Sequence, residues 1–211
     1  ARASLLGKQP NDWDITTSAK PEEVKAIFHR TIDTGIQHGT VTVLVDREIL
    51  DDGSGSPASH TDYAFEVTTY RVDGVYTDHR RPESVCFTAS LEEDLKRRDF
   101  TINAMAYNPE QGVIDIFGGQ KDLEKGIIRC VGEASERFDE DALRILRAVR
   151  FAAQLDFVIE NQTREAMRDQ AKFLKDISAE RIRTELTKMI VSKHPERLEE
   201  AYELGLTNIF L

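Results

Sequence analysis

Hydrophobic and polar positions change their pattern once along the chain, near residue 132. Before that point, β-branched and aromatic residues gather in short runs typical of strands, and one run alternates with a period of about two. The predicted strands span residues 40–45, 63–72, 84–89, 113–117 and 127–131. After that point the strand signals end and the period is helical. The predicted helices span about 137–154, 161–175, 178–192 and 195–204.

Two earlier segments carry helix-start signals. Pro21 followed by Glu22 and Glu23 places a proline and two acids in a first turn. Ser90 with an acid three residues later predicts a helix that continues to about residue 107. The Gly- and Ser-containing stretch 51–57 reads as a loop. The sequence therefore predicts an α+β fold, with an α+β domain over 1–131 followed by a helical one over 132–211.

Composition excludes several classes of protein. The 211 residues carry no apolar run near the ~20 residues of a membrane span and no signal segment, so we expect no membrane association. Cys86 and Cys130 stand far apart, which favours reduced thiols in a cytoplasmic protein. The net charge of −10 argues against a surface built as a whole to bind nucleic acid, although 28 Lys and Arg remain for a local basic site.

Two aspartates near the N-terminus form the first candidate site. If residues 13–17 form a strand, Asp12 and Asp14 point to the same side, because side chains alternate along a strand. Carboxylates that close repel each other unless a divalent cation lies between them, and hard oxygen ligands suit Mg²⁺. A lone Asp-x-Asp pair is more often a solvated turn, so both interpretations stay open at this point.

The second candidate site is the segment from Arg97 to Asn103, expected on a helix. Arg98 and Asn103 suit a phosphate and a sugar hydroxyl, since guanidinium groups make strong bidentate contacts with phosphate. An exposed helix face with ordinary Arg–Asp pairing explains the same residues.

The third candidate site is a helical stripe. At ~100° per residue, the apolar positions after residue 141 fall on one side of the predicted helix. Polar residues spaced three apart wind along the other side: Asp141, Arg144, Arg147 and Arg150. Three arginines on one stripe repel each other unless an anion lies along them. For this helix considered alone, a surface of ordinary ion pairs is the simpler interpretation.

Asp141 and Arg144 together offer a hydrogen-bond acceptor beside a donor. Cytosine and adenine both present an amino donor next to a ring-nitrogen acceptor, whereas uracil and guanine reverse this pattern. One Asp–Arg pair is therefore able to accept C and A and to refuse U and G.

Five ordered motifs give the chain a specific resemblance. It resembles the class II tRNA nucleotidyltransferases, the CCA-adding enzyme family of the polymerase-β-like superfamily, over essentially its whole length. The motifs are Leu5-Leu6-Gly7 to Thr17, Arg97 to Asn103, Asp115-x-x-Gly118 to Leu123, Glu140-Asp141-x-x-Arg144, and Arg181-x-x-x-Glu185-Leu186.

This resemblance implies a polymerase-β-like head, a mixed sheet with flanking helices, followed by a helical neck and the start of a body. It implies template-independent addition of C and A to the 3′ end of tRNA from CTP and ATP, with release of pyrophosphate. Asp12 and Asp14 would be catalytic and would hold Mg²⁺. The third and fifth motifs would be a structural hinge and a helix-stabilising element. The implied nucleotide-binding residues are Arg2 and Arg98 at the triphosphate, Asp141 and Arg144 at the base, and Arg147 and Arg150.

Some features depart from the family pattern or leave alternatives open. Ala3 stands where the family has Asp, and the preceding glycines are absent, which also suits a catalytically silent RNA- or nucleotide-binding module. The chain has no initiator Met and stops after the neck helices, so we expect an N-terminal portion. Residues 71–80 resemble the loop linked to A addition, which disfavours a CC-only enzyme. An A-only enzyme and a poly(A) polymerase remain alternatives.

Overall fold

The computed structural model describes residues 1–10, 13–46, 63–74, 76 and 84–210. Its contacts divide the chain into two compact units. We call them the sheet unit, made of Gly7–Val72 and Val85–Asp94, and the helical unit, made of Ala1–Leu6, Asp73–Ser84 and Leu95–Leu211. Each unit is described by itself.

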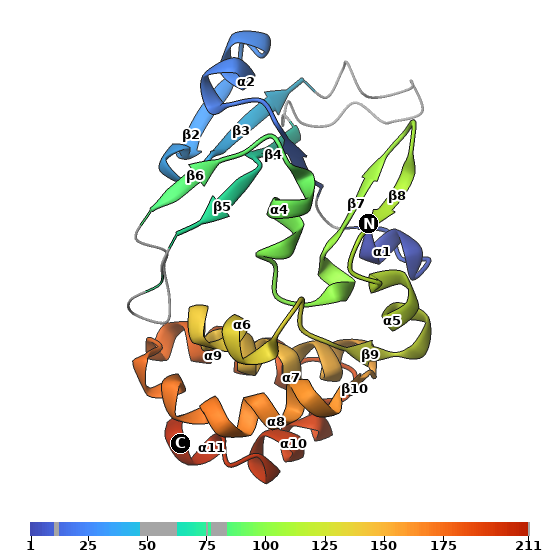
Figure 1. Ribbon diagram of the computed structural model, residues 1–211, viewed down its shortest axis with the longest axis vertical. Coiled ribbons are helices and arrows are strands. Elements are labelled where there is room, and N and C mark those ends of the chain that lie inside the picture. Colours follow the sequence, from blue (N-terminus) through green and yellow to red (C-terminus); the bar gives the residue numbers. More distant parts are fainter. Residues whose placement is uncertain (11–12, 47–62, 75, 77–83, 211) are drawn as a thin grey trace. The chain divides into compact units, whose positions relative to one another are not determined.

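The sheet unit is built on a four-stranded mixed sheet (Figure 1). Its strands, in spatial order, are β1 (Asp14–Thr17), β4 (Tyr63–Thr69), β3 (Thr40–Val45) and β2 (Thr31–Gly35). The pair β1–β4 is parallel, and the other two pairs are antiparallel. A 3₁₀ turn, Ile36–His38, joins β2 to β3.

The two faces of this sheet differ in chemistry. Helix α2 (Pro21–Ile27) packs Val24 against Val41, Val43 and Val67. Pro21 begins the helix, and the Lys20 backbone N–H donates to the Glu23 carboxylate at 2.7 Å, which confirms the predicted helix start. The opposite face is polar and carries hydroxyl pairs, Thr34–Thr42 at 2.8 Å and Thr40–Thr68 at 3.0 Å.

The helical unit surrounds the longest helix, α7 (Leu143–Leu155). Ile145, Leu146 and Val149 are fully buried on it, as the apolar period predicts. The unit's other helices are α1 (Arg2–Leu5), α5 (Gly119–Lys125), α6 (Ala134–Glu140), α8 (Asn161–Gln170), α9 (Ala179–Ile190), α10 (Leu198–Glu203) and α11 (Thr207–Phe210). Its strand pairs are β7 (Met105–Asn108) with β8 (Gly112–Asp115), and β9 (Ile127–Ile128) with β10 (Val158–Ile159). Its 3₁₀ segments are Thr101–Asn103, Ala171–Asp176 and Pro195–Arg197.

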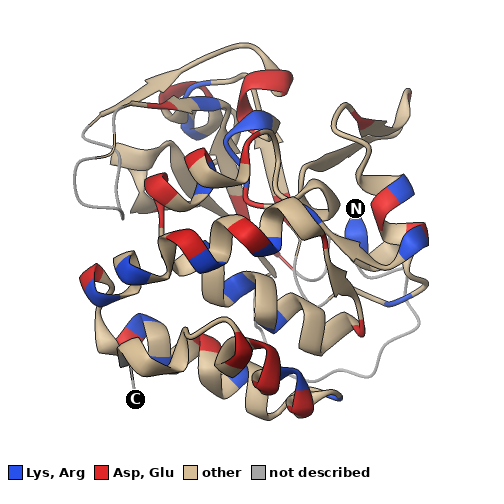
Figure 2. Ribbon diagram, turned by 60° about the horizontal axis from the view of Figure 1, so that its bottom comes forward, with Lys and Arg blue, Asp and Glu red and all other residues tan. Residues whose placement is uncertain are grey.

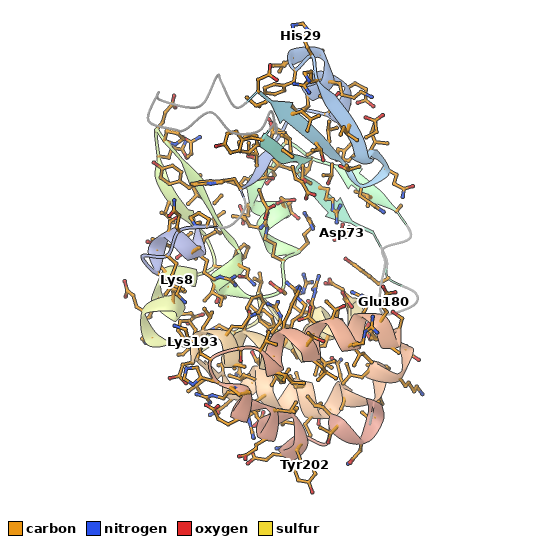
Figure 3. All side chains as sticks on the ribbon, turned by 180° about the vertical axis from the view of Figure 1, so that it is seen from behind. Lys8, His29, Asp73, Glu180, Lys193 and Tyr202 are labelled. Carbon is orange, nitrogen blue, oxygen red and sulfur yellow. The ribbon has the colours of Figure 1, made fainter. Side chains whose placement is uncertain are left out.

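Basic and acidic residues are both present along the helices of this unit (Figure 2). On α10, Tyr202 is 72% exposed and points outward (Figure 3). No helix in the described part of the chain is long and apolar enough to cross a membrane.

Most predicted elements are confirmed with shorter bounds. The run 63–72 divides into β4 and β5 (Arg71–Asp73), and 84–89 contains β6 (Val85–Phe87), which pairs with β5. Helix α9 matches its prediction closely, whereas 161–175 and 195–204 each divide into an α-helix and a 3₁₀ segment. Strands β2 and β7 were not predicted. The loop predicted at 51–57 lies outside the described residues.

Two predicted helices are wrong in extent. The helix expected over 90–107 is only α4 (Leu91–Lys96), because Phe100 adopts an extended backbone, is fully buried and bridges to Cys130. The helix expected from about residue 137 to 154 is interrupted at Asp141, which has φ −143° and ψ 101° and separates α6 from α7.

Candidate functional site

In the sheet unit, two carboxylates share the polar face of the sheet. Asp14 on β1 is in register with Glu66 on the parallel strand β4, and both are exposed. Register partners on adjacent strands lie about 4.8 Å apart and point to the same face. Asp12 lies outside the described residues, so its place beside Asp14 stays a prediction. Glu66 was not among the predicted site residues.

Among the described residues no group of three metal-ligating side chains occurs. The Asp14–Glu66 pair nevertheless offers the hard oxygen donors that Mg²⁺ prefers, and its exposure leaves coordination positions for water or phosphate. The chemistry of the donor set therefore fits a magnesium ion shared with a third carboxylate.

In the helical unit, Asp99 is the centre of a buried network. Its Oδ2 accepts from Arg147 Nε at 2.9 Å, and its Oδ1 accepts from the Asn103 side-chain amide at 2.9 Å and from the Phe100 backbone N–H at 2.8 Å. Burial alone would raise the pKa of Asp99, but the Arg147 charge and these hydrogen bonds outweigh it and lower the pKa. Asp99 thus stays ionised and holds Arg147 and Asn103 in place.

Arg2 and Arg98 both contact Asn103. The guanidinium of Arg2 donates to the Asn103 side-chain oxygen, and Arg98 Nη1 donates to the Asn103 backbone oxygen at 3.4 Å. Arg98 follows the end of α4 in a turn and is not on a long helix as predicted. The structure therefore brings together three residues that the sequence singled out: Arg2, Arg98 and Asn103.

Asp141 does not belong to the stripe on α7. Its Oδ1 accepts from the Leu143 backbone N–H at 3.1 Å, so the side chain caps the start of the next helix. Its Oδ2 accepts from Arg181 Nη2 of α9 at 2.8 Å. The prediction of one continuous helical stripe is wrong because this capping bond suits an extended residue and not a helical one.

Arg144 is held mainly by its own unit's backbone and by Glu140. Its Nη1 donates to Glu140 Oε2 at 2.7 Å, and its Nη2 donates to the Arg97 carbonyl at 3.0 Å. Burial raises the pKa of Glu140, although the Arg144 and Arg137 charges oppose that shift. These contacts fix the plane of the Arg144 guanidinium, three residues after the break at Asp141.

Arg150, the last predicted arginine, is paired rather than free. It donates to the buried Glu185 carboxylate on α9 and to Gln154 Oε1 at 2.8 Å. Burial lowers the pKa of Arg150, partly offset by Glu185. Arg181 and Glu185 lie one turn apart on α9, and they bind Asp141 and Arg150. These two contacts are how the fifth motif could stabilise the neighbouring helix α7.

The third motif forms the start of α5. Asp115 accepts from the backbone N–H groups of Gly119 and Gln120 at 2.7 and 2.9 Å. A Cβ atom on Gly119 would lie 2.2 Å from the Thr101 carbonyl oxygen, so only glycine fits this approach.

Part of the predicted loop 71–80 also lies beside this network. The Tyr76 hydroxyl donates to Asp73 Oδ2 at 2.8 Å, and burial, with the Asp73 charge second, raises the pKa of Tyr76. Tyr76, Arg137 and Glu140 line an open pocket of about 320 Å³. Residues 75 and 77–80 of this loop lie outside the described residues.

Sequence reasoning missed two partners of the candidate site. Glu66 occupies a polar position in the alternating run 63–72, but only the pairing of β1 with β4 relates it to Asp14. Glu140 belongs to the fourth motif, and its i, i+4 spacing to Arg144 is the sequence signal that indicates their ion pair.

A mixed sheet followed by helical segments is the fold of a polymerase-type head domain. Residues 1–129 match the family model described as "Poly A polymerase head domain", and residues 156–211 match "Probable RNA and SrmB- binding site of polymerase A". The chain belongs to the poly(A) polymerase head-domain family.

Similar proteins include CCA-adding enzymes, both among curated relatives and among solved structures. A "CCA-adding enzyme" of Leuconostoc mesenteroides is 52% identical over 97% of this chain and 47% of its own length. The solved structure of the Bacillus stearothermophilus CCA-adding enzyme in complex with CTP has a TM-score of 0.82 at 44% identity, covering 97% of this chain and 46% of that one. The Thermotoga maritima CCA-adding enzyme complexed with tRNA_CCA has a TM-score of 0.71 at 27% identity, covering 97% and 45%.

These comparisons confirm the predicted fold class, a polymerase-β-like head followed by helices. The chain spans about half the length of the curated relatives it matches.

Proposed function

We propose that this protein adds C and A nucleotides to the 3′ end of tRNA from CTP and ATP, without a template. The observation that carries the proposal is the 52% identity to a CCA-adding enzyme, which extends over 97% of the chain and thus through both units. The proposed division is a catalytic head over 1–131 and a helical region for nucleotide recognition over 132–211. We also propose a cytoplasmic location, in keeping with a role in tRNA processing.

The proposed reaction is an in-line displacement. The 3′-hydroxyl oxygen of the tRNA attacks the α-phosphorus, a phosphodiester bond forms, and pyrophosphate leaves. Asp12 and Asp14 are the proposed catalytic residues and metal ligands, with Glu66 as a third carboxylate on the same sheet face. When bound, Mg²⁺ supplies Lewis-acid activation of the hydroxyl and neutralises charge on the phosphates.

The helical unit supplies nucleotide binding in this proposal. Arg2 and Arg98 contact the triphosphate, and their shared contact with Asn103 sets their spacing. Asp141 accepts the amino group of C or A, and Arg144 donates to the neighbouring ring nitrogen. The Arg181 contact orients the Asp141 carboxylate as an acceptor, so a carbonyl at that position of uracil is repelled.

The test uses the full-length protein and tRNA that lacks its 3′ CCA. With CTP alone we expect two C residues, with ATP alone no addition, and with both a complete CCA end. Addition of A only to tRNA already ending in CC would identify an A-only enzyme. A long A tail would identify a poly(A) polymerase. No incorporation under any condition would identify a catalytically silent binding module.

Variants test the carboxylates within the same assay. Asp14→Asn is expected to lower incorporation by about 10³-fold, because several kcal/mol of metal stabilisation are lost. The matched control is Asp33→Asn, an exposed carboxylate on β2 that pairs with Lys25. Near-normal turnover by Asp14→Asn would exclude this site as the catalytic centre.

A further inference from the structure

Three arginine side chains surround one buried aromatic ring in the helical unit. Phe151 on α7 is 4% exposed. The guanidinium carbons of Arg150, Arg2 and Arg147 lie 3.9, 4.7 and 5.4 Å from its ring centroid. All three fall within the ~6 Å over which a cation is attracted by an aromatic ring.

The positive charge of this cluster is only partly balanced. Arg147 pairs with Asp99, and Arg150 pairs with Glu185. Arg2 donates to the neutral Asn103 side chain and makes no ion pair with a carboxylate in the described ranges. Burial lowers the pKa of Arg2, the Asp99 charge opposes that shift, and the charges of Arg150 and Arg147 lower the pKa further. The three cations are therefore close enough to act on one another.

The ring is well suited to hold cations together. The faces of an aromatic ring carry partial negative charge, so they attract guanidinium groups that otherwise repel one another. Phe100 packs edge-on against Phe151, at 5.8 Å between centroids and 82° between planes, and thereby fixes the direction of its faces. An aliphatic side chain would fill the same space without that attraction.

We propose that Phe151 is a positioning residue that gathers Arg2, Arg147 and Arg150 into one site for the triphosphate of the incoming nucleotide. The proposal rests on the proposed function for the identity of its ligand. A polyphosphate matches the cluster because it brings several negative charges to guanidinium groups whose own carboxylates leave one positive charge in excess. The base is not part of this site, so the site is expected to bind CTP and ATP with the same affinity.

The experiment measures binding of inorganic tripolyphosphate, CTP and ATP to the full-length protein by calorimetry. Phe151→Leu is expected to weaken all three by about 10-fold, since three cation–ring contacts are lost. In the incorporation assay the KM for both nucleotides should rise by a similar factor while kcat stays close to that of the unmodified protein. The CTP-over-UTP preference should not change.

Phe157→Leu is the matched control. Phe157 is buried in the same core, and its ring carries no guanidinium contact among the described residues. Thermal unfolding of both variants measures the general cost of removing a buried ring. If Phe151→Leu does not fold, Phe151→Met replaces it, because the unbranched side chain fills the space without a π face.

Equal tripolyphosphate affinity in the Phe151 and Phe157 variants would overturn the proposal. A loss confined to CTP or to ATP would also overturn it, because the ring would then act through the base. These outcomes are distinct from failure of the proposed function, which shows as absent incorporation by the unmodified protein.

Discussion

At the scale of single residues, three ionised groups of the candidate nucleotide site are each held by a partner of opposite charge. Glu140 holds Arg144, Asp99 holds Arg147, and Arg181 holds Asp141. Removing one member of a part-buried pair leaves the other uncompensated, so such pairs specify orientation more than they add stability. Under the proposed function, discrimination between bases depends on this fixed orientation.

The first prediction concerns base selection. The double change Asp141→Ala with Arg144→Ala should reduce the CTP-over-UTP ratio of kcat/KM by roughly 10- to 100-fold, since each unsatisfied buried group costs ~1–3 kcal/mol. UTP presents a ring N–H to the donor Arg144 and a carbonyl to the acceptor Asp141, and both repulsions vanish in the variant. Steady-state kinetics with each nucleotide give the ratio.

Arg168→Ala with Asp169→Ala is the control for this prediction, since it removes one charge of each sign from exposed positions on α8. Its ratio should stay at the unmodified value. An unaltered CTP-over-UTP ratio in the Asp141 and Arg144 variant would mean that these two residues do not select the base.

At the scale of elements, the starts of helices α5 and α7 depend on side chains from outside the helix. Asp115 accepts two backbone N–H groups of α5, and Asp141 accepts one from α7. The free N–H groups of a first helical turn need such acceptors, and a negative charge there is favourable to the helix dipole. Both aspartates thereby fix where a helix begins next to a functional segment.

Asp115→Ala should lower the free energy of unfolding by about 2 kcal/mol, because two charge-assisted hydrogen bonds are lost from a part-buried position. Urea denaturation followed by circular dichroism gives the value. Asp115→Asn keeps one acceptor oxygen and should cost less than the alanine variant. A cost below ~0.5 kcal/mol for alanine would show that water satisfies the α5 start equally well.

The hydrophobic pattern within a segment predicted well those helices and strands that depend only on that segment. The apolar period of α9 and the β-branched run of β3 both gave nearly correct bounds. The break at Asp141 escaped prediction because a side-chain capping bond overrides a continuous helical period there. Strand β2 has the mixed sequence Thr31–Gly35 and shows no alternation. The Asp14–Glu66 pairing depends on residues far apart in sequence, which no local pattern contains.

At the scale of the whole molecule, the net charge of −10 coexists with a basic cluster because the charges are segregated locally. Arg2, Arg147 and Arg150 gather around one ring, whereas acidic residues dominate elsewhere, for instance at Glu199 and Glu200 on α10. Under the proposed function, a negative surface repels nucleic acid that approaches away from the site, so this charge distribution favours productive encounters over non-specific ones.

The two cysteines report separately on opening of the fold. Burial raises the pKa of Cys130 to about 12, so its thiol stays protonated in the native helical unit, whereas Cys86 is exposed. Iodoacetamide at pH 8 should therefore label Cys86 rapidly and Cys130 at least ~100-fold more slowly. Peptide mass spectrometry measures the two rates.

In denaturant the two labelling rates should converge. A Cys86→Ser variant confirms the assignment of the fast site. Equal rates under native conditions would contradict the buried position of Cys130.

The contact between Arg2 and Phe151 sets an order of events during synthesis. The two residues are 151 − 2 = 149 positions apart, so the ribosome needs roughly 7–30 s to reach the second after the first. During that interval Arg2 has been synthesised, but Phe151, whose ring it contacts in the folded protein, has not. Strands β2 and β3 are only a few residues apart in sequence, so their pairing does not have to wait for synthesis of a distant segment. Slower or faster decoding between these positions therefore changes how long the nascent N-terminal segment waits for its partner.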